Sequence, residues 1–230
     1  MSTFTPPQTT LASSQVILGL MRITELDAEQ IRTLVATARD AGVNTFDHAD
    51  IYGGAPHVCE QLFGDAVTFS AADRESVVIQ SKVGIRPGRF DFSKEHILET
   101  VDGSLAALRT DYLDTLLLHR PDTLVEPDEV AAAFDELEAS GKVRTFGVSN
   151  HTPGQMELLK RSVKQPLAFN QVQLSITHAP IIASGIAANM QVVLGSTKAA
   201  RIVDGAAGSD VPLTREEWYR LFTAAGHTLP

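Results

Sequence analysis

Four residues whose types suit proton transfer each come after a strand-like run of the sequence: Asp47, Tyr52, Lys82 and His119. A tyrosine can protonate a developing alkoxide only if its pKa, near 10 in water, is brought down. An adjacent ammonium does this by stabilising the phenolate. Lys82 can supply that charge, Asp47 can hold Lys82 through a charge-assisted hydrogen bond, and a neutral His119 can polarise a carbonyl oxygen. This set holds an acid but no electron source, so reduction of a carbonyl requires a hydride donor bound beside it.

Each of the four residues also has an ordinary structural interpretation. A lysine at a strand end is usually solvated, an aspartate often caps a turn, and a histidine or tyrosine can be a packing residue. The position that they share favours chemistry, because the C-terminal ends of strands converge at one face of a parallel barrel.

Seven apolar, β-branched runs of strand length alternate with segments of helical spacing. The near-continuous hydrophobicity of runs such as VVIQSKV and QVVLGS predicts strands buried on both faces, as in a parallel sheet. The predicted strands are Val16–Arg22, Val43–Asp50, Val77–Gly84, Tyr112–Arg120, Lys142–Asn150, Phe169–Ser175 and Gln191–Thr197. Capping-box spacing predicts three helix starts, at Asp27 with Gln30, Thr152 with Gln155, and Thr214 with Glu217.

Strict β–α alternation is typical of a doubly wound sheet or of a (β/α)₈ barrel. The doubly wound fold predicts G-x-G-x-x-G after its first strand, whereas this chain continues as GLMRITELD. We therefore predict an α/β fold, a (β/α)₈ TIM barrel. Residues 1–15 are expected to form a flexible N-terminal arm and residues 16–230 a single barrel domain.

One strand of the expected eight is missing from the sequence. Only about fifteen residues separate the sixth predicted strand from the last, which is too few for a crossover helix and another strand. We expect the numbered sequence to lack the seventh strand and the chain to show a break between about Gly185 and Val192.

The bulk properties exclude several classes of protein. A formal net charge of −9 argues against binding nucleic acid or an acidic membrane. The single Cys59 cannot form an intrachain disulfide, and residues 1–15 lack the pattern of a secretory signal. No stretch approaches the roughly 18 consecutive apolar residues that span a bilayer. The cytoplasm is the expected location.

The segments FDHADIYGG, SKVG, LLLHRPD, GKVRTFGVSN, NQVQ and VVLGSTKAARI resemble, in order and spacing, the signature segments of the aldo/keto reductase superfamily. The resemblance runs from about residue 15 to 205, and HADIYGG together with the closing LTREEWYRLFTAAG is most similar to the bacterial oxidoreductases of that superfamily. It implies a (β/α)₈ barrel that reduces a small-molecule carbonyl compound with NADPH, or less often NADH. The acid–base tyrosine of the family falls on Tyr52 and its lysine on Lys82; its aspartate and histidine fall on Asp47 and His119.

The same resemblance implies a dinucleotide site across the C-terminal face of the barrel. The nicotinamide carboxamide would be held by the positions of Ser149, Asn150 and Gln171, and the ribose would meet main-chain groups near Met21 and Arg22. The 2′-phosphate site falls on GSTKAAR, where Lys198 and Arg201 would supply local positive charge. The implied cofactor-binding residues are Met21, Arg22, Asp47, Ser149, Asn150, Gln171, Ser196, Lys198 and Arg201.

The sequence departs from the family pattern in two ways. The seventh strand of the family carries an aromatic residue that stacks on the nicotinamide and residues that grip the phosphates, and no such strand lies between Ser175 and Gln191. The pyrophosphate contacts are therefore unassigned. Gly205 lies where many members have a polar residue beside the adenine, which leaves the choice between NADP and NAD open.

Three other functions are compatible with some of these residues. Lys82 could be the nucleophile of a Schiff-base lyase, although Asp47 would hold it charged. A cofactor-binding sensor without turnover would keep the same fold. A metal hydrolase would gather His48, Asp50, His57 and His119.

Overall fold

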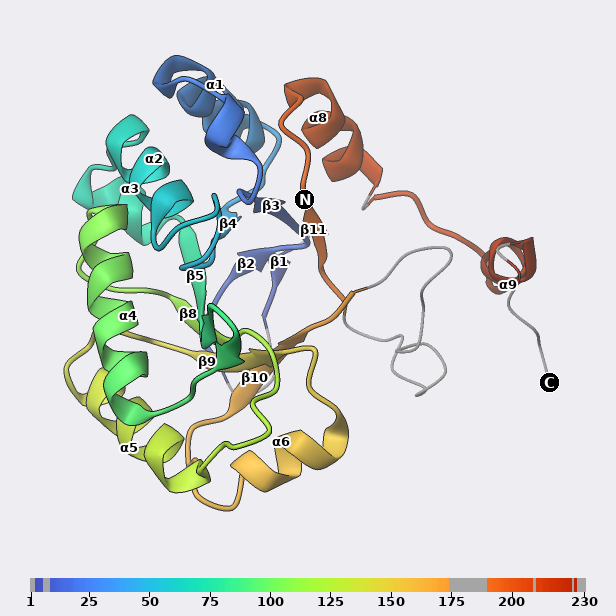
Figure 1. Cartoon of the computed structure of the whole chain (residues 1–230). Helices are drawn as coiled ribbons and strands as arrows, with labels where there is room; N and C mark the ends of the chain where they lie inside the picture. Colours follow the sequence, from blue (N-terminus) through green and yellow to red (C-terminus); the bar gives the residue numbers. More distant parts are fainter. Residues whose placement is uncertain (1–2, 6–8, 174–189, 209, 225, 227–230) are drawn as a thin grey trace.

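Seven parallel strands form one curled sheet, in the spatial order β10-β9-β8-β5-β4-β3-β11 (Figure 1). This computed structural model describes residues 3–5, 9–173, 190–208, 210–224 and 226. The strands are β3 (Val16–Gly19), β4 (Thr45–Asp47), β5 (Val78–Val83), β8 (Thr115–Leu118), β9 (Phe146–Ser149), β10 (Leu167–Gln171) and β11 (Val192–Leu194). All seven predicted strands are confirmed; each is shorter than its apolar run, and β10 begins two residues before the predicted start at Phe169.

Most of the helices follow the strands and pack on the outer side of the sheet, whereas the last one, Arg215–Ala224, lies apart from it (Figure 1). They are η1 (Ile23–Glu25), α1 (Ala28–Asp40), α2 (Val58–Ala66), α3 (Ala71–Glu75), α4 (Lys94–Leu108), α5 (Pro127–Ala139), α6 (Pro153–Leu159), α8 (Ala199–Gly208) and α9 (Arg215–Ala224). Two of the predicted capping boxes, at the starts of α1 and α6, close with both hydrogen bonds. At the third, the backbone N–H of Glu217 donates to Thr214 Oγ1 and that of Thr214 to Glu217 Oε2.

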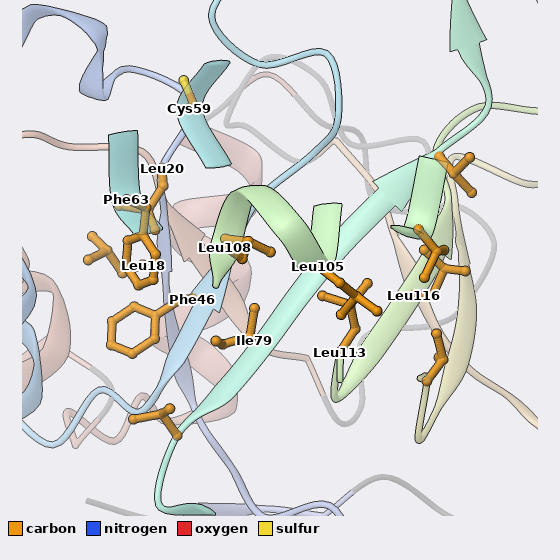
Figure 2. Close-up of a cluster of buried hydrophobic side chains, with 14 of the residues drawn as sticks. Leu18, Leu20, Phe46, Cys59, Phe63, Ile79, Leu105, Leu108, Leu113 and Leu116 are labelled. Atoms are coloured by element: carbon orange, nitrogen blue, oxygen red, sulfur yellow. The ribbon is translucent and has the colours of Figure 1, made fainter. Parts of the chain in front are cut away.

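The apolar core lies between the sheet and the helices. Alternate residues of a strand point to opposite faces, so Leu18, Phe46 and Ile79 point toward α2 and α4, where they meet Phe63 and Leu108 (Figure 2). Asp47, Gln80 and Lys82 occupy the other face of the same strands. The sheet thus separates an apolar helix-side layer from a polar inner surface.

Part of the segment expected to be a flexible arm is built into the fold. β1 (Thr3–Phe4) pairs antiparallel with β2 (Ser13–Ser14). Ser13 and Ser14 are buried, and the backbone N–H of Ser14 donates to Asn44 Oδ1 at 2.7 Å. Polar residues of the segment that was expected to be a flexible arm thus form hydrogen bonds at the start of β4. A second small hairpin, β6 (Ile85–Arg86) with β7 (Arg89–Phe90), follows β5 and was not predicted.

The sheet has two edges among the described residues, β10 and β11. The seventh strand of the predicted barrel would lie between these two strands. β11, the last strand in the sequence, pairs in parallel with β3, the first strand of the sheet, and closure of a barrel requires such a pairing. Among the described residues the sheet is curled and has seven strands, and the closed eight-stranded barrel that was predicted is not shown. The expected break between about Gly185 and Val192 falls mostly on residues 174–189, which lie outside the described residues.

Within the described ranges, no helix is both long enough and apolar enough to cross a bilayer.

Candidate active site

Lys82 is the centre of the polar inner surface. Its ammonium nitrogen lies 2.7 and 2.9 Å from the two carboxylate oxygens of Asp47, and it also donates to the backbone oxygen of His48 at 2.7 Å. The fourth contact is to the phenol oxygen of Tyr52, at 2.8 Å. Lys82 is 2 % exposed and Asp47 is 2 % exposed, so this ion pair is shielded from water. The structure brings together the residues that the sequence placed on two different strands.

Asp47 is held from a second side by two amides. Gln80 Nε2 donates to Asp47 Oδ1 at 2.5 Å, and Gln171 Nε2 lies 3.4 Å from Asp47 Oδ2. Gln80 was not predicted from the sequence. The signal was present, because Gln80 is two residues before Lys82 and alternate residues of a strand share a face. Gln80 fixes the carboxylate in the orientation in which it accepts from Lys82.

Burial and charge act in opposite directions on Lys82 and Tyr52. Burial by itself lowers the pKa of Lys82, but the Asp47 carboxylate and the Tyr52 hydroxyl together outweigh it, and the net pKa lies above the usual value. Burial raises the pKa of Tyr52, and the Lys82 ammonium only partly offsets this. The expected depression of the Tyr52 pKa is therefore wrong for the protein as described here, because burial outweighs the neighbouring charge. Both side chains keep their protons at neutral pH.

His119 is a neutral group at the same site. Burial, with the Lys82 charge as the next cause, lowers the pKa of His119 to about 3. The imidazole ring meets the Tyr52 ring edge to face, with ring centroids 5.9 Å apart. Its Nδ1 is buried without a hydrogen-bond partner in the described part of the chain. A neutral imidazole can donate or accept a hydrogen bond at the cavity.

These side chains line a cavity of about 650 Å³ at the C-terminal ends of the strands. Lys82, Tyr52 and His119 form one part of its wall, and Ser149, Asn150 and Gln171 form another. Met21 also lines the cavity, whereas Arg22 does not. The remaining lining residues are Ile51, Gly53, Ile85, Arg120, Val172 and Gln173.

The wall built by Ser149, Asn150 and Gln171 joins the ends of β9 and β10. Ser149 Oγ donates to the backbone oxygen of Gln171 at 2.8 Å, and Asn150 Nδ2 donates to Ser149 Oγ at 2.9 Å. Asn150 has φ of 57°, a left-handed conformation that asparagine tolerates better than most residues. This geometry presents a hydroxyl and two amides on one side of the cavity.

The three residues predicted to bind a 2′-phosphate lie away from this cavity, where β11 leads into α8. The backbone N–H of Lys198 donates to Ser196 Oγ at 3.2 Å. Lys198 and Arg201 are exposed, and neither forms an ion pair with any residue that the structure describes.

Comparison with known proteins identifies the family. The model of the aldo/keto reductase family matches residues 15–192. This chain belongs to the aldo/keto reductase family. It is 46 % identical to YcsN, an uncharacterised oxidoreductase of Bacillus subtilis, over 72 % of this chain and 58 % of the relative. A crystal structure of a thermostable aldo-keto reductase in complex with the inhibitor epalrestat superimposes with a TM-score of 0.82 at 21 % identity, covering 97 % of this chain and 99 % of that one.

The matched part of this aldo/keto reductase spans 58 % of the length of YcsN. A 6-dehydroglucose reductase of Novosphingobium aromaticivorans is 30 % identical over 290 aligned positions, which cover 96 % of this chain and 94 % of the relative. Because this chain has 230 residues, at least 60 of those 290 positions have no counterpart in it. That length exceeds what a strand and a crossover helix need.

A second buried polar group of this aldo/keto reductase lies next to the loop of Tyr52 and the strand of Lys82, and it was not predicted. The carboxylate of Glu60 accepts from His57 Nδ1 at 2.5 Å, from Ser81 Oγ at 2.5 Å and from Ser104 Oγ at 3.1 Å. Burial opposes its charge, but the hydrogen bonds from His57 and Ser81 hold the pKa of Glu60 below its usual range. Ser81 precedes Lys82 on β5, and the backbone N–H of His57 donates to the oxygen of Asp50 at 2.6 Å. Glu60 therefore ties the loop that carries Tyr52 to the strand that carries Lys82.

The residues considered for a metal hydrolase and for a Schiff-base lyase have other contacts in the structure. His57 pairs with Glu60, and His48 packs edge to face on Phe63 with ring centroids 4.7 Å apart. Among the described residues, no three His, Cys, Asp or Glu side chains gather as a metal would require. Lys82 is held protonated by Asp47, which disfavours a nucleophilic role in Schiff-base chemistry.

Proposed function

We propose that this aldo/keto reductase reduces a small-molecule aldehyde or ketone to an alcohol, and catalyses the reverse oxidation, with Tyr52 as the proton donor. One observation carries the proposal: Tyr52, Lys82 and His119 line one cavity, and Lys82 bridges Tyr52 to the buried carboxylate of Asp47. The cavity of about 650 Å³ has the size of a small-molecule site.

Hydrogen-bond direction leaves the tyrosine proton available. The phenol oxygen of Tyr52 accepts from the Lys82 ammonium, so its own hydrogen is not used in that contact. The raised pKa of Tyr52 keeps this hydrogen in place until a stronger base forms. A carbonyl oxygen that gains negative charge is such a base. As the proton leaves Tyr52, the fixed ammonium stabilises the phenolate that remains.

His119 has a complementary role at the carbonyl oxygen. Because the pKa of His119 is lowered to about 3, the imidazole is neutral over the working pH range and does not compete with Tyr52 as an acid. A neutral N–H can still donate a hydrogen bond and orient the carbonyl.

The residues on the opposite wall suit a nicotinamide cofactor. The hydroxyl of Ser149 and the amides of Asn150 and Gln171 offer the donors and acceptors that a carboxamide needs. A bound dihydronicotinamide would supply the hydride that these side chains lack. We propose NADPH over NADH, because Lys198 and Arg201 are exposed cations without ion pairs in the described part of the chain, at the segment where the family resemblance places the 2′-phosphate.

A steady-state screen of aldehydes and ketones with NADPH and NADH in parallel tests this function. Oxidation of NADPH that depends on an added carbonyl, together with formation of the alcohol, is the expected result. Tight binding of NADPH without turnover of any carbonyl in a broad panel would instead favour a sensor built on the reductase fold.

A further inference from the structure

Arg120 is a cation without a counter-charge at the wall of the cavity. It directly follows His119, lines the same cavity and is exposed. It forms no ion pair with any residue in the described ranges. The carboxylate closest in sequence, Asp122, accepts instead from the backbone N–H groups of Phe92 at 3.1 Å and Leu124 at 2.9 Å.

The charge of the cavity wall is opposite to that of the whole protein. The chain has a net charge of −9, yet no aspartate or glutamate is among the residues described as lining the cavity. The charge of Lys82 is balanced by Asp47, and His119 is neutral. Among the described residues that line the cavity, Arg120 is therefore the charged side chain that has no counter-charge. A fixed positive charge in a recess attracts anions.

Arg120 also lies close to the group that would orient the carbonyl. Its positive charge is one of the causes that lower the pKa of His119, which places the guanidinium within electrostatic reach of the imidazole. A guanidinium presents a planar fork of donors that matches a carboxylate or a phosphate.

We propose that Arg120 binds an anionic group of the substrate, so that the preferred substrates are aldehydes or ketones that carry a carboxylate or a phosphate near the carbonyl. This inference rests on the proposed carbonyl reduction. The pyrophosphate of the cofactor is the other anion that such a cation could bind. The position of Arg120 favours the substrate, because it directly follows His119, the residue proposed to orient the carbonyl, whereas the side chains of the cavity wall proposed for the carboxamide come from the ends of β9 and β10.

A matched pair of substrates tests the proposal. 4-Carboxybenzaldehyde carries the anion, and its methyl ester presents the same aldehyde without the charge. The variant Arg120→Gln removes the cation, and Arg161→Gln removes another exposed arginine, in the turn after α6. We expect the ratio of kcat/KM for the acid to kcat/KM for the ester to fall about tenfold or more in Arg120→Gln, the scale of one charge-assisted contact. In Arg161→Gln the ratio should stay within about twofold of the wild-type value, since a distant exposed charge is largely screened.

The dissociation constant of NADPH, measured by fluorescence titration of each variant, separates the two sources of the anion. A loss of NADPH affinity in Arg120→Gln, with an equal loss of kcat/KM for acid and ester, would assign the arginine to the cofactor phosphates and overturn the proposal. No change in either quantity would show that Arg120 is a solvated surface arginine and would overturn it as well.

Failure of the proposed function gives a different pattern, in which the wild-type protein turns over neither aldehyde. Calorimetric titration with 4-(hydroxymethyl)benzoate and with its methyl ester then tests the anion contact without turnover. Tighter binding of the acid that is lost in Arg120→Gln supports the contact. Equal binding of acid and ester, or binding of neither, counts against it.

Discussion

The phenol oxygen of Tyr52 lies 2.8 Å from the ammonium nitrogen of Lys82, although Tyr52 is in the loop after β4 and Lys82 is near the end of β5. Neither residue is placed by its own sequence neighbours alone. The register of β4 against β5, which pairs Asp47 with Gln80, sets the separation of the two side chains. The hydrogen bonds of Glu60 fix the loop between them.

Removing the phenol oxygen should separate catalysis from binding. Tyr52→Phe is expected to lower kcat by at least about 10²-fold, the usual scale of a general acid, while the fold and the NADPH dissociation constant are retained. Tyr112→Phe is the matched control, because the Tyr112 hydroxyl donates to Glu75 at 3.0 Å and lies outside the cavity. Near-wild-type turnover in Tyr52→Phe would mean that Tyr52 only covers the cavity.

Removing only one partner of the ion pair between Asp47 and Lys82 should destabilise the protein. Asp47→Asn leaves a buried ammonium without its counter-charge, and we expect the free energy of unfolding to drop by about 3–5 kcal/mol. The double variant Asp47→Asn/Lys82→Met removes the unpaired charge, so it should be more stable than the single variant. Urea denaturation of the wild type, both single variants and the double variant completes the cycle. Additive effects of the two substitutions would show that the pair is not coupled.

All seven strands could be predicted from the sequence, and so could the ends of strands at which Asp47, Tyr52, Lys82 and His119 come together. Strands buried on both faces stand out as apolar runs, and a polar residue at the end of such a run is conspicuous, as Asp47 and Lys82 are. Gln80 was missed because it is a polar residue inside the run, and only its alternation with Lys82 places it on the inner face.

Two other properties depend on three-dimensional packing. Glu60 lies three residues after His57 at the start of α2, where the sequence alone shows no unusual pattern. Its partners Ser81 and Ser104 come from β5 and α4. The pKa of Tyr52 was expected to fall because the sequence predicted the Lys82 ammonium beside it. The burial that raises it depends on how the loop packs, which no local pattern records.

Asp50 should make stability depend on pH. Burial, with the Glu60 charge as the next cause, raises the pKa of Asp50 from 3.8 to about 7. The folded protein therefore binds more protons than the unfolded chain in this window, and the stabilisation present below about pH 4 is lost as the pH rises to about 7. A shift of this size corresponds to at most about 4 kcal/mol.

Asp50→Asn cannot ionise and should remove this dependence. Relative to the wild type, the variant should gain stability at pH 8 compared with pH 5, as measured by urea denaturation at both pH values. Asp111→Asn, at an exposed position, serves as the control. A stability difference between Asp50→Asn and wild type that is the same at both pH values would contradict the prediction.

The pH profile of the reaction should lack a histidine step. Because the pKa of His119 is lowered to about 3, the imidazole stays neutral as the pH falls from 8 to 5. We expect kcat/KM for a neutral aldehyde to show no loss near pH 6.5, the ordinary value for histidine. His119→Asn keeps a hydrogen-bond donor and should give a profile of the same shape at lower activity. An acid-side inflection near pH 6.5 that disappears in His119→Asn would refute the neutral assignment.

Cofactor choice should depend on Lys198 and Arg201. Both are exposed where β11 leads into α8, and neither is paired with a carboxylate in the described part of the chain, so an incoming 2′-phosphate need not displace a partner. Exposure weakens each contact through screening, so we expect about a tenfold loss of NADPH affinity for each charge removed, the lower end of the range for charge-assisted hydrogen bonds. Arg201→Ala should raise the dissociation constant of NADPH and leave that of NADH nearly unchanged, which isolates the phosphate from the rest of the dinucleotide.

Arg215→Ala is the control for this variant, because it removes the same charge from the start of α9 and tests the effect of the overall electrostatic field. The measurement is a fluorescence titration of both cofactors at low and high salt, where the NADPH preference should shrink as salt is added. Equal dissociation constants of NADPH and NADH in the unmodified protein would remove the assignment of a 2′-phosphate site to this segment.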